Sequence, residues 1–420
     1  MKVVIAGAGI GGLTAALFLH RQGIAVEVFE QAQDIRALGV GIVLMPHAVA
    51  QLAALDLLPA LDAIATRSAH MYYQTRRGQG VWDEPRGMLA GHAVPQFFAH
   101  RGLLQTMLYD AACRTLRAGS IHLGHRSEAF RQTEESVEVD VVDVDTGSVD
   151  TIRGDVLIGA DGIHSVVRRG IVPDEGPLLW SGLMMWRGAV DWPAFRGGAS
   201  MLIAGGVDAK FVCYPIGPGN TAATRLTNWV VCARTAAFGA TPPRREDWSR
   251  TGQMAELAPL LRQFTVDTVD IGALIAATDT FWEYPMCDRD PIAHWSDGRV
   301  TLLGDAAHPM YPMGGNGASQ AILDARCLSD ALATHDDPVA ALKSYQQDRL
   351  PGTSEIVRLN RGGGPEAVID AIEVRAPDGF DDIDAVLSRS EREKIVRGYA
   401  SKSSVMSARA VAQSVASAGR

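Results

Sequence analysis

The stretch VVIAGAGIGG at residues 3–12 decides the fold of the N-terminal part of the chain. Its apolar run, residues 3–6, predicts a buried strand that leads without a break into a glycine turn. The segment after the turn lacks helix breakers until Gly23, and residues 26–29 predict a second strand with Glu30 at its end. Strand, glycine turn, helix, strand and acid in this order are typical of a βαβ unit that binds a dinucleotide.

The three glycines of the turn have separate tasks in such a unit. Gly7 permits the tight turn, Gly9 lets the backbone approach a pyrophosphate, and Gly12 lets the helix pack closely on the strand. The helix N-terminus then faces the phosphates with unpaired N–H groups and a positive dipole end. Glu30 is placed to accept hydrogen bonds from a ribose diol. We therefore predict a site for an adenine dinucleotide.

The same stretch has a second interpretation, a secretory signal peptide with Lys2 as its charged region and residues 3–19 as its apolar core. Four glycines interrupt that core, and no A-x-A cleavage site precedes a change of composition. Because the second strand continues the alternating strand–helix pattern, we favour the dinucleotide site.

Composition places the chain among ordinary globular proteins. It has 420 residues, of which 47% are hydrophobic and 21% charged, and a net charge of −9. This acidic balance argues against a nucleic-acid partner, and the sequence contains no glycine-free, uncharged apolar run of the roughly 20 residues that cross a bilayer. Five cysteines without CxxC or zinc spacing predict mostly buried thiols of a reducing compartment. We expect a cytoplasmic protein without a metal site.

The strand patterns along the chain predict a discontinuous dinucleotide domain. Residues 156–160 and 299–303 repeat the buried-strand pattern, whereas the part between them has shorter strands and Gly/Pro loops. We expect an α/β fold, α+β overall, with a Rossmann-like domain, an inserted, mainly antiparallel β-sheet substrate domain and a C-terminal helical segment. We expect the Rossmann-like domain over residues 1–70, 99–177 and 282–345, and the substrate domain over residues 71–98 and 178–281. We expect the C-terminal helical segment over residues 346–420, with a disordered Ala/Ser-rich end.

Three motifs follow one another in a specific order: GAGIGG at 7–12, GADGIHSVVR at 159–168, and LLGDAAHPMYPMGGNGASQAILDA at 302–325. Together with His100-Arg101 and Arg349-Leu350-Pro351, they resemble the single-component, FAD-dependent aromatic hydroxylases, the p-hydroxybenzoate hydroxylase-like family. The resemblance runs from residue 1 to about residue 355. Four further segments are most similar to phenazine hydroxylases of this family that act on 5-methylphenazine-1-carboxylate: Trp186-Arg187-Gly188, Tyr284-Pro285-Met286, Asp288-Arg289-Asp290-Pro291 and Met310-Tyr311-Pro312-Met313-Gly314.

The resemblance implies that the dinucleotide is FAD. Asp161-Gly162 would serve both FAD and the nicotinamide donor, Asp305 would bind the ribityl chain, and the helix from Gly317 would direct its positive end at the flavin pyrimidine. Simpler roles stay open, namely a turn at Asp161, a helix cap at Asp305 and a surface arginine at Arg101. The full set of expected FAD contacts is Gly7, Gly9, Ile10, Gly11, Gly12, Glu30, Arg36, Gly41, Arg101, Gln105, Asp161, Gly162, Gly304, Asp305, Gly315, Asn316 and Gly317.

The resemblance also implies the reaction. FAD would be reduced by NADH or NADPH, would react with O2, and would hydroxylate an aromatic or heteroaromatic substrate through a flavin C4a-hydroperoxide. Nowhere else in the sequence is a GxGxxG motif preceded by a strand and followed by an acid, so the nicotinamide would bind only transiently. Such chemistry needs a site that excludes water, because water and loose protons divert the oxygen to hydrogen peroxide.

Candidates for the substrate side come from the middle domain and the loop before residue 317. Trp186, Tyr214, Tyr311 and Met313 are candidate walls, with plain core packing as the alternative, and Arg187 could meet a substrate carboxylate or form a structural ion pair. No acid–base residue stands out among His47, His100, His164, His294 and His308. We therefore assign no catalytic residue to the protein, and expect the flavin to carry the chemistry.

Other flavin and nicotinamide proteins share the first motif. A halogenase should add a WxWxIP segment and a catalytic lysine, and Lys210 is the lone lysine of the middle domain. A nicotinamide dehydrogenase has no use for the second and third motifs. An epoxidase, a decarboxylating hydroxylase or a non-catalytic flavin-binding protein stay as alternatives. The expected partner is a small aromatic molecule, and the expected assembly is a monomer or homodimer.

Overall fold

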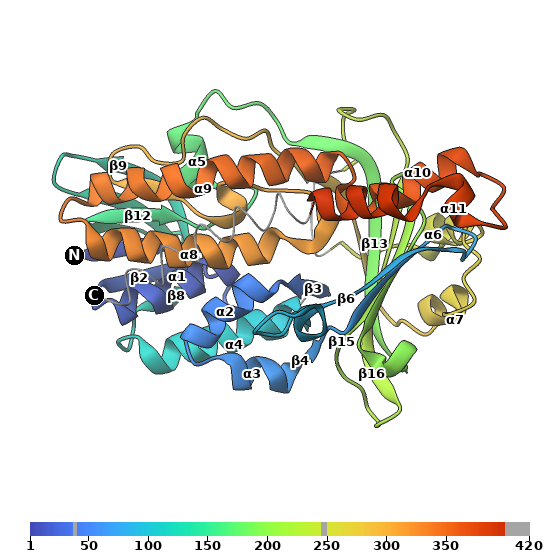
Figure 1. The fold of residues 1–420 in the computed structure, drawn as a ribbon. Coiled ribbons are helices and arrows are strands. Elements are labelled where there is room, and N and C mark those ends of the chain that lie inside the picture. Colours follow the sequence, from blue (N-terminus) through green and yellow to red (C-terminus); the bar gives the residue numbers. More distant parts are fainter. Residues whose placement is uncertain (37–39, 245–249, 400–420) are drawn as a thin grey trace.

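The computed structural model describes residues 1–36, 40–244 and 250–399. Two β-sheets dominate it (Figure 1): a parallel sheet surrounded by helices at one end, and a larger sheet, containing β13, β15 and β16, at the other. The long helices α8 (Gly317–Thr334) and α9 (Pro338–Arg361) run from the first sheet towards the second. The N-terminus of α8 therefore lies between the two sheets.

The parallel sheet has five strands in the order β18-β12-β1-β2-β8, and each neighbouring pair is parallel. Its central strands are buried along almost their whole length because helices and a further sheet cover its faces. The strands are β1 (Lys2–Ala6), β2 (Ala25–Glu30), β8 (Ile121–Leu123), β12 (Val156–Gly159) and β18 (Val300–Leu302). The remaining helices of this part are α1 (Ile10–Arg21), α2 (Pro46–Ala54), α3 (Leu58–Ile64), α4 (Arg101–Thr115) and α5 (Val166–Ile171).

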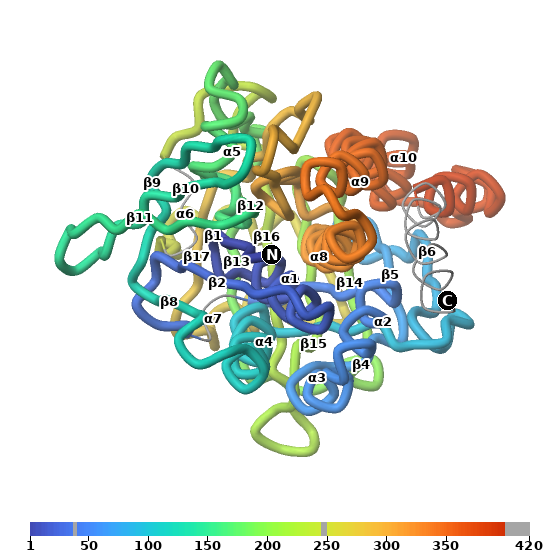
Figure 2. The backbone as a smooth tube through the Cα atoms, turned by 90° about the vertical axis from the view of Figure 1, so that its left-hand side faces the viewer, coloured from blue at the N-terminus to red at the C-terminus, as the bar shows by residue number. Residues whose placement is uncertain are grey.

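Two three-stranded sheets complete this part of the molecule. The antiparallel sheet of β9 (His125–Gln132), β10 (Val137–Asp143) and β11 (Val149–Gly154) lies on the side of the parallel sheet away from α8 and α9 (Figure 2). The second sheet consists of β3 (Gly41–Leu44), β7 (Phe97–His100) and β4 (Ala65–Arg67). Strand β3 brings its first residue to the larger sheet, and β7 leads directly into α4.

The larger sheet has seven strands in the order β17-β13-β16-β15-β14-β5-β6. All pairs are antiparallel except β14 with β5. The expected boundary at residue 281 falls at the start of β17, so this sheet extends to Asp288. The strands are β5 (His70–Gln74), β6 (Gly80–Pro85), β13 (Leu179–Pro193), β14 (Ser200–Ala204), β15 (Ala209–Pro218), β16 (Thr224–Arg234) and β17 (Phe281–Asp288).

The two faces of the seven-stranded sheet have different neighbours. On the outer face Trp186, Phe211 and Trp229 pack in one cluster with residues of α6 (Met254–Leu261) and α7 (Ile271–Ala276). On the inner face Met185 and Tyr284 pack with residues of the loop before α8. Since neighbouring residues of a strand point to opposite faces, each strand serves both a structural core and the region between the sheets.

Beyond α9 the described part of the chain continues in short helical elements. They are the 3-10 turn η5 (Gly364–Glu366), α10 (Ala367–Arg375), α11 (Ile383–Val386), and a helical stretch over residues 389–399. The Ala/Ser-rich end, for which disorder is expected, lies outside the described residues, as do 37–39 and 245–249. Among the described helices none is both long and apolar enough to cross a membrane. The five cysteines are free thiols, with Cys113 exposed and Cys213, Cys232 and Cys287 buried.

Candidate functional site: a dinucleotide cradle between two sheets

The glycine turn after β1 is packed tightly on one side and open on the other. Gly7 has a φ of +104°, and a side chain there would overlap the Ala160 carbonyl. A side chain on Gly12 would overlap the carbonyl of Gly7, so helix α1 approaches the strand as closely as the motif predicts. By contrast, a Cβ atom on Gly9 would have no protein atom within 4 Å. The turn thus leaves space where a pyrophosphate would approach.

Glu30 and Gln105 both bind the backbone of this turn. The Glu30 carboxylate accepts hydrogen bonds from the N–H groups of Ala8 (2.8 Å) and Ala32 (2.9 Å). The Gln105 amide donates to the carbonyl of Ala8 over 2.9 Å. The structure therefore brings the end of β2 and the helix α4 to the glycine turn, although they are distant in sequence.

The two arginines expected at the cofactor lie at the surface. Arg36 is exposed and its guanidinium donates to the Asp34 carboxylate over 2.7 Å. Arg101 is exposed at the first position of α4, where its backbone N–H donates to Val40. The ring of His100 caps this helix by accepting from Leu103 over 3.3 Å.

The Asp161-Gly162 motif forms a helix cap. The Asp161 carboxylate accepts from the N–H of Val166 (2.7 Å) and from the Ser165 hydroxyl, and so closes the first turn of α5. Burial raises the pKa of Asp161. Gly162 has a φ of +76° and faces open space. The simpler expectation of a structural turn accounts for the side chain of Asp161, while the open backbone at Gly162 is compatible with a ligand.

A fully buried ionic network holds the Gly304-Asp305 turn that follows β18. Asp324 of α8 is buried, contacts the ring of His308 at 2.5 Å and accepts from the Arg349 guanidinium over 2.7 Å. Its carboxylate also accepts from the N–H of Gly304 over 3.1 Å. This network fixes the turn to α8 and α9 and leaves the side chain of Asp305 exposed at the sheet edge.

The loop before α8 turns sharply through two glycines. Gly314 and Gly315 have φ values of +67° and +65°, and a Cβ atom on Gly315 would lie 3.0 Å from Val43 of β3. Asn316 is buried and donates from its side-chain amide to the hydroxyl of Tyr399 over 2.8 Å. Gly317 begins α8, and a side chain there would meet no protein atom within 4 Å. The start of α8 is therefore open, as is Gly9.

The inner face of the seven-stranded sheet faces this loop. Arg187 of β13 is buried and donates to the Tyr284 hydroxyl (2.7 Å) and to the carbonyl of Gly41 (2.9 Å). Tyr311 and Met313 pack in a buried cluster with Tyr284 and neighbouring apolar residues of the same face. Three of the expected substrate residues, Arg187, Tyr311 and Met313, are thus on one side of the sheet.

Trp186 does not belong to this set. Its side chain lies on the outer face, packs in the cluster with Trp229, and donates from its ring N–H to Glu283 over 3.1 Å. The prediction that Trp186 and Arg187 line one pocket is therefore wrong, because consecutive residues of a strand point to opposite faces. Core packing, the alternative interpretation, is the role of Trp186.

Gly41 and Tyr214 pack against each other, so neither faces open space at this point. The N–H of Gly41 donates to the side chain of Asn228 over 2.8 Å, and a Cβ atom on Gly41 would lie 2.7 Å from the Tyr214 hydroxyl. Tyr214 also packs against Phe98, with ring centroids 5.1 Å apart. This close approach explains why the position is a glycine, and it joins β3 to the larger sheet.

Sequence reasoning missed several residues of this region. Tyr284 contacts Arg187 and Asn228 contacts Gly41, both from strands next to β13. Tyr284 stands in a segment that carries the family resemblance, which was the available signal for it, whereas Asn228 follows another polar residue, Thr227, and has no distinguishing pattern. Lys210 is buried, forms an ion pair with Glu366 and lies 3.2 Å from the Met313 sulfur. A lone lysine in an apolar strand was visible in the sequence, but its partner in the C-terminal segment was not.

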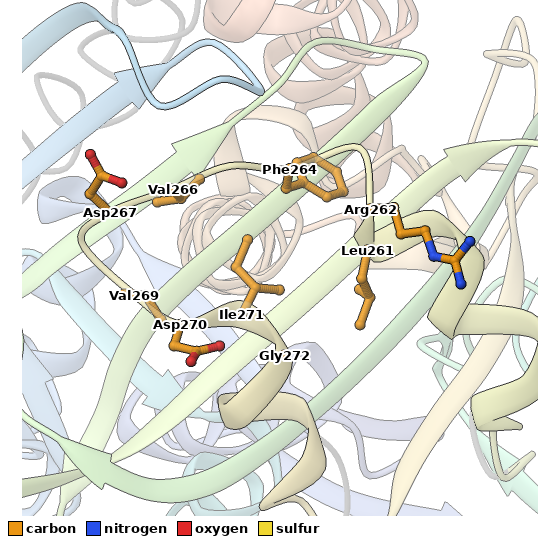
Figure 3. Close-up of a pocket in the computed structure, with 9 residues that line it drawn as sticks. All are labelled: Leu261, Arg262, Phe264, Val266, Asp267, Val269, Asp270, Ile271 and Gly272. Atoms are coloured by element: carbon orange, nitrogen blue, oxygen red, sulfur yellow. The ribbon is translucent and has the colours of Figure 1, made fainter.

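One open depression lies away from this region. A cavity of about 460 Å³ is lined by residues that lead from the end of α6 to the start of α7, including Arg262, Phe264 and Asp270 (Figure 3). Phe264 belongs to the outer-face cluster of the seven-stranded sheet. This cavity is therefore on the opposite face of the sheet from Arg187 and the loop before α8.

An elongated dinucleotide fits the cradle that these residues form. Gly9 and Gly162 leave open space at the carboxyl edge of the parallel sheet, where ligands of such sheets bind, and Gly317 leaves open space at the start of α8. Helices α1 and α8 both begin without a side-chain cap, so their first-turn N–H groups can meet anionic groups. The start of α1 is thus suited to a pyrophosphate. The start of α8, next to the inner face of the large sheet, is suited to a second anionic group.

Comparison with known proteins agrees with this geometry. Residues 1–360 match the family described as FAD binding domain. The chain is 42% identical to phenazine 1,6-dicarboxylic acid hydroxylase of Lysobacter antibioticus, over 86% of this chain and 89% of that protein. It is 32% identical to 3-hydroxybenzoate 6-hydroxylase 1 of Aquipseudomonas alcaligenes, over 86% and 88% respectively.

Solved structures share the fold. A substrate complex of salicylate hydroxylase superposes with a TM-score of 0.73 at 22% identity, covering 97% of this chain and 98% of that chain. Klebsiella pneumoniae HpxO, complexed with FAD and uric acid, gives a TM-score of 0.75 at 24% identity and covers 96% of both chains.

The fold and the cradle therefore define a flavoprotein of the Rossmann-like class. The chain belongs to the FAD-binding-domain family of aromatic hydroxylases, and it is an FAD-dependent monooxygenase that uses NADH or NADPH and O2 to hydroxylate an aromatic substrate.

Proposed function

We propose that the substrate is a planar aromatic or heteroaromatic acid, and that Arg187 binds its carboxylate. The observation that carries the proposal is the burial of Arg187 on the sheet face that meets the loop before α8. A guanidinium offers planar, charged donors that match a carboxylate, and low solvent exposure strengthens such a contact. The contacts with Tyr284 and Gly41 hold the guanidinium in a fixed orientation.

We propose that FAD binds along the open positions at the starts of α1 and α8. Gly7, Gly9 and Gly12 with the start of α1 would hold the pyrophosphate, and Glu30 the adenosine ribose. The set extends over Ile10, Gly11, Arg36, Gly41, Arg101, Gln105, Asp161, Gly162, Gly304, Asp305, Gly315, Asn316 and Gly317. When bound, FAD supplies the redox chemistry that activates O2. The partial positive charge at the start of α8 would stabilise negative charge on the reduced ring.

The protein's own part beside the cofactor is to orient the substrate and exclude water. Tyr311 and Met313 are 3% and 4% exposed and pack against Met185, Tyr284 and Met286. Apolar side chains in this position would keep water from the reacting ring, which favours hydroxylation over release of peroxide.

The substrate class receives support from the relatives. The names of the two sequence relatives describe a phenazine dicarboxylate and a hydroxybenzoate, both aromatic acids. We propose that the present substrate is of this type. We also propose a monomer or homodimer that works in the cytoplasm without a nucleic-acid or membrane partner, in line with the net charge of −9 and the free cysteines.

A substrate screen with two variants tests the proposal. Phenazine carboxylates, quinolones, salicylates and hydroxybenzoates are incubated with enzyme, FAD and either NADH or NADPH, and nicotinamide loss, peroxide and product mass are recorded together. In Arg187→Met we expect KM for the acid to rise roughly tenfold to a hundredfold, the loss that corresponds to a charge-assisted hydrogen bond. The matched control is Arg234→Met, an arginine of the same sheet whose partner is Asp208 at the surface.

The decarboxylated analogue separates binding of the carboxylate from general damage. Its KM should hardly differ between wild type and Arg187→Met. An equal rise of KM for the acid and for the analogue, or no rise for the acid, would contradict the proposed role of Arg187.

A further inference from the structure

The C-terminal arm, residues 362–399, lies beyond the part of the chain that matches the family, yet it contacts the loop at the start of α8. The family match ends at residue 360. The arm continues through η5, α10 and α11, which extend along the seven-stranded sheet in Figure 1, and its last described residue is Tyr399. Tyr399 is buried with 7% of its surface exposed.

The hydroxyl of Tyr399 joins two asparagines. It accepts a hydrogen bond from the side-chain amide of Asn316 (2.8 Å) and donates to the side-chain oxygen of Asn360 (2.8 Å). The Asn360 amide in turn donates to the backbone carbonyl of Tyr311 over 2.8 Å. One tyrosine hydroxyl is therefore linked to both ends of the loop from Tyr311 to Asn316.

The ring of Tyr399 also shapes the middle of this loop. A Cβ atom on Gly314 would lie 2.5 Å from the Tyr399 hydroxyl and 2.7 Å from its ring. A Cβ atom on Gly364 of the arm would lie 3.2 Å from Met313. Since Gly314 has a φ of +67°, the loop passes the ring in a conformation that other residues rarely adopt. Loop and arm are packed against each other without spare room.

These contacts determine how α8 begins. Asparagine is among the residues that most often cap a helix, by accepting from the N–H groups of its first turn. Asn316 stands directly before α8 but forms no such bond, because its backbone is already helical (φ −92°, ψ −20°) and its amide is held by Tyr399. The first-turn N–H groups therefore keep their hydrogen-bonding capacity and their positive end for another acceptor.

We propose that Tyr399 is a positioning residue for the flavin: it holds Asn316 and the loop from Tyr311 so that the start of α8 stays open to the isoalloxazine. The inference rests on the proposed placement of FAD at α8. In this proposal the C-terminal arm contributes to the cofactor site through Tyr399. Because reduced flavin carries more negative charge than oxidised flavin, loss of this positioning should weaken binding of the reduced form more.

The test compares two tyrosine variants of the full-length holoenzyme without any aromatic substrate. Tyr399→Phe keeps the ring and removes the hydroxyl. Tyr73→Phe is the matched control, because Tyr73 is also buried and its hydroxyl accepts from Arg86 rather than from a residue of the loop before α8. FAD affinity is measured by fluorescence quenching, the midpoint potential by equilibration with a redox dye, and folding by thermal unfolding.

We expect Tyr399→Phe to bind FAD about fivefold more weakly, the factor for one lost buried hydrogen bond, and to have a more negative midpoint potential. Tyr73→Phe should keep both values. A second variant, Asn360→Leu, removes the acceptor for Tyr399 and should shift the potential in the same direction, which covers the case in which Tyr399→Phe does not fold.

Unchanged affinity and potential in either folded Tyr399→Phe or Asn360→Leu would overturn the proposal, as would equal shifts in Tyr73→Phe. A wrong substrate class cannot produce these results because no substrate is present. Failure of the wild-type protein to bind FAD would instead count against the proposed cofactor site itself.

Discussion

At the residue scale, the glycines of the first motif differ in what a side chain would meet. Gly7 and Gly12 are needed by the protein itself, since a Cβ atom on either would overlap backbone. Gly9 has open space around it, so its lack of a side chain serves the ligand. The motif in the sequence predicts all three positions, and the structure separates the folding requirement from the binding requirement.

This difference predicts opposite outcomes for two similar substitutions. Gly9→Ala should leave the free energy of unfolding of the FAD-free protein nearly unchanged and weaken FAD binding about tenfold, which corresponds to about 1.4 kcal/mol. Gly7→Ala should destabilise the FAD-free protein by about 2 kcal/mol or more, because of its positive φ and the overlap with Ala160. Urea unfolding and FAD titration measure both. Equal loss of stability in the two variants would contradict this assignment.

The substrate side shows where residue-level prediction fails. The alternation of β13 assigns Trp186 and Arg187 to opposite faces, but alternation does not say which face meets the flavin domain. The orientation of the sheet depends on contacts with Gly41 and with the loop before α8. Gly41 is 146 residues away from Arg187 in the sequence. Aromatic side chains also fill cores more often than binding sites, so Trp186 carried no distinguishing signal.

At the element scale, the network around Asp324 ties the β18 turn, α8 and α9 together. Burial alone would raise the pKa of Asp324, but the charges of His308 and Arg349 outweigh it and lower the pKa to about 2. Because this pKa lies below the value of about 3.9 in an unfolded chain, the ionised carboxylate stabilises the fold. That contribution is complete well above pH 4 and is lost as the pH falls towards 2.

Asp324→Asn should therefore cost about 3–5 kcal/mol of unfolding free energy near neutral pH, because it leaves the buried Arg349 without its counter-charge. The difference between wild type and variant should shrink below about pH 5. Urea unfolding of both proteins at several pH values measures this difference. A constant difference down to pH 3 would show that the Asp324 charge does not carry the effect.

Elements were predictable to different degrees. The parallel strands and the start of α8 at Gly317 follow from apolar runs and glycines in the sequence. The extension of the large sheet through β17 was less visible, because the segment from Phe281 to Asp288 contains a proline and its pairing with β13 is a contact between distant parts of the chain. Local patterns identify a strand, whereas its sheet is chosen by partners that are remote in sequence.

At the scale of the whole molecule, the proposed FAD site lies at the meeting of the parallel sheet, the large sheet and the C-terminal arm. Gly41 contacts Arg187 and Asn228 of the large sheet, while Asn316 contacts Tyr399 of the arm. The link from Asn316 to Tyr399 spans 83 residues. No sequence motif marks it, since a tyrosine and an asparagine so far apart have no recognisable spacing.

A ligand held by several parts of the molecule should stabilise all of them together. Free FAD at a hundred times its dissociation constant should raise the free energy of unfolding by about 2.7 kcal/mol relative to the FAD-free protein. Thermal unfolding at increasing FAD concentration should show one transition that moves to higher temperature. A separate unfolding transition of the large sheet, at a temperature that does not change with FAD concentration, would indicate that the two sheets do not bind FAD together.

A turnover experiment with isotopically labelled O2 measures hydroxylation by the protein directly. Purified protein is incubated with FAD, NADH or NADPH and the panel of aromatic acids, and the products are analysed by mass spectrometry. We expect at least one acid to gain a single oxygen atom that carries the label. Label found only in hydrogen peroxide with every acid, despite normal FAD binding and nicotinamide consumption, would contradict this expectation.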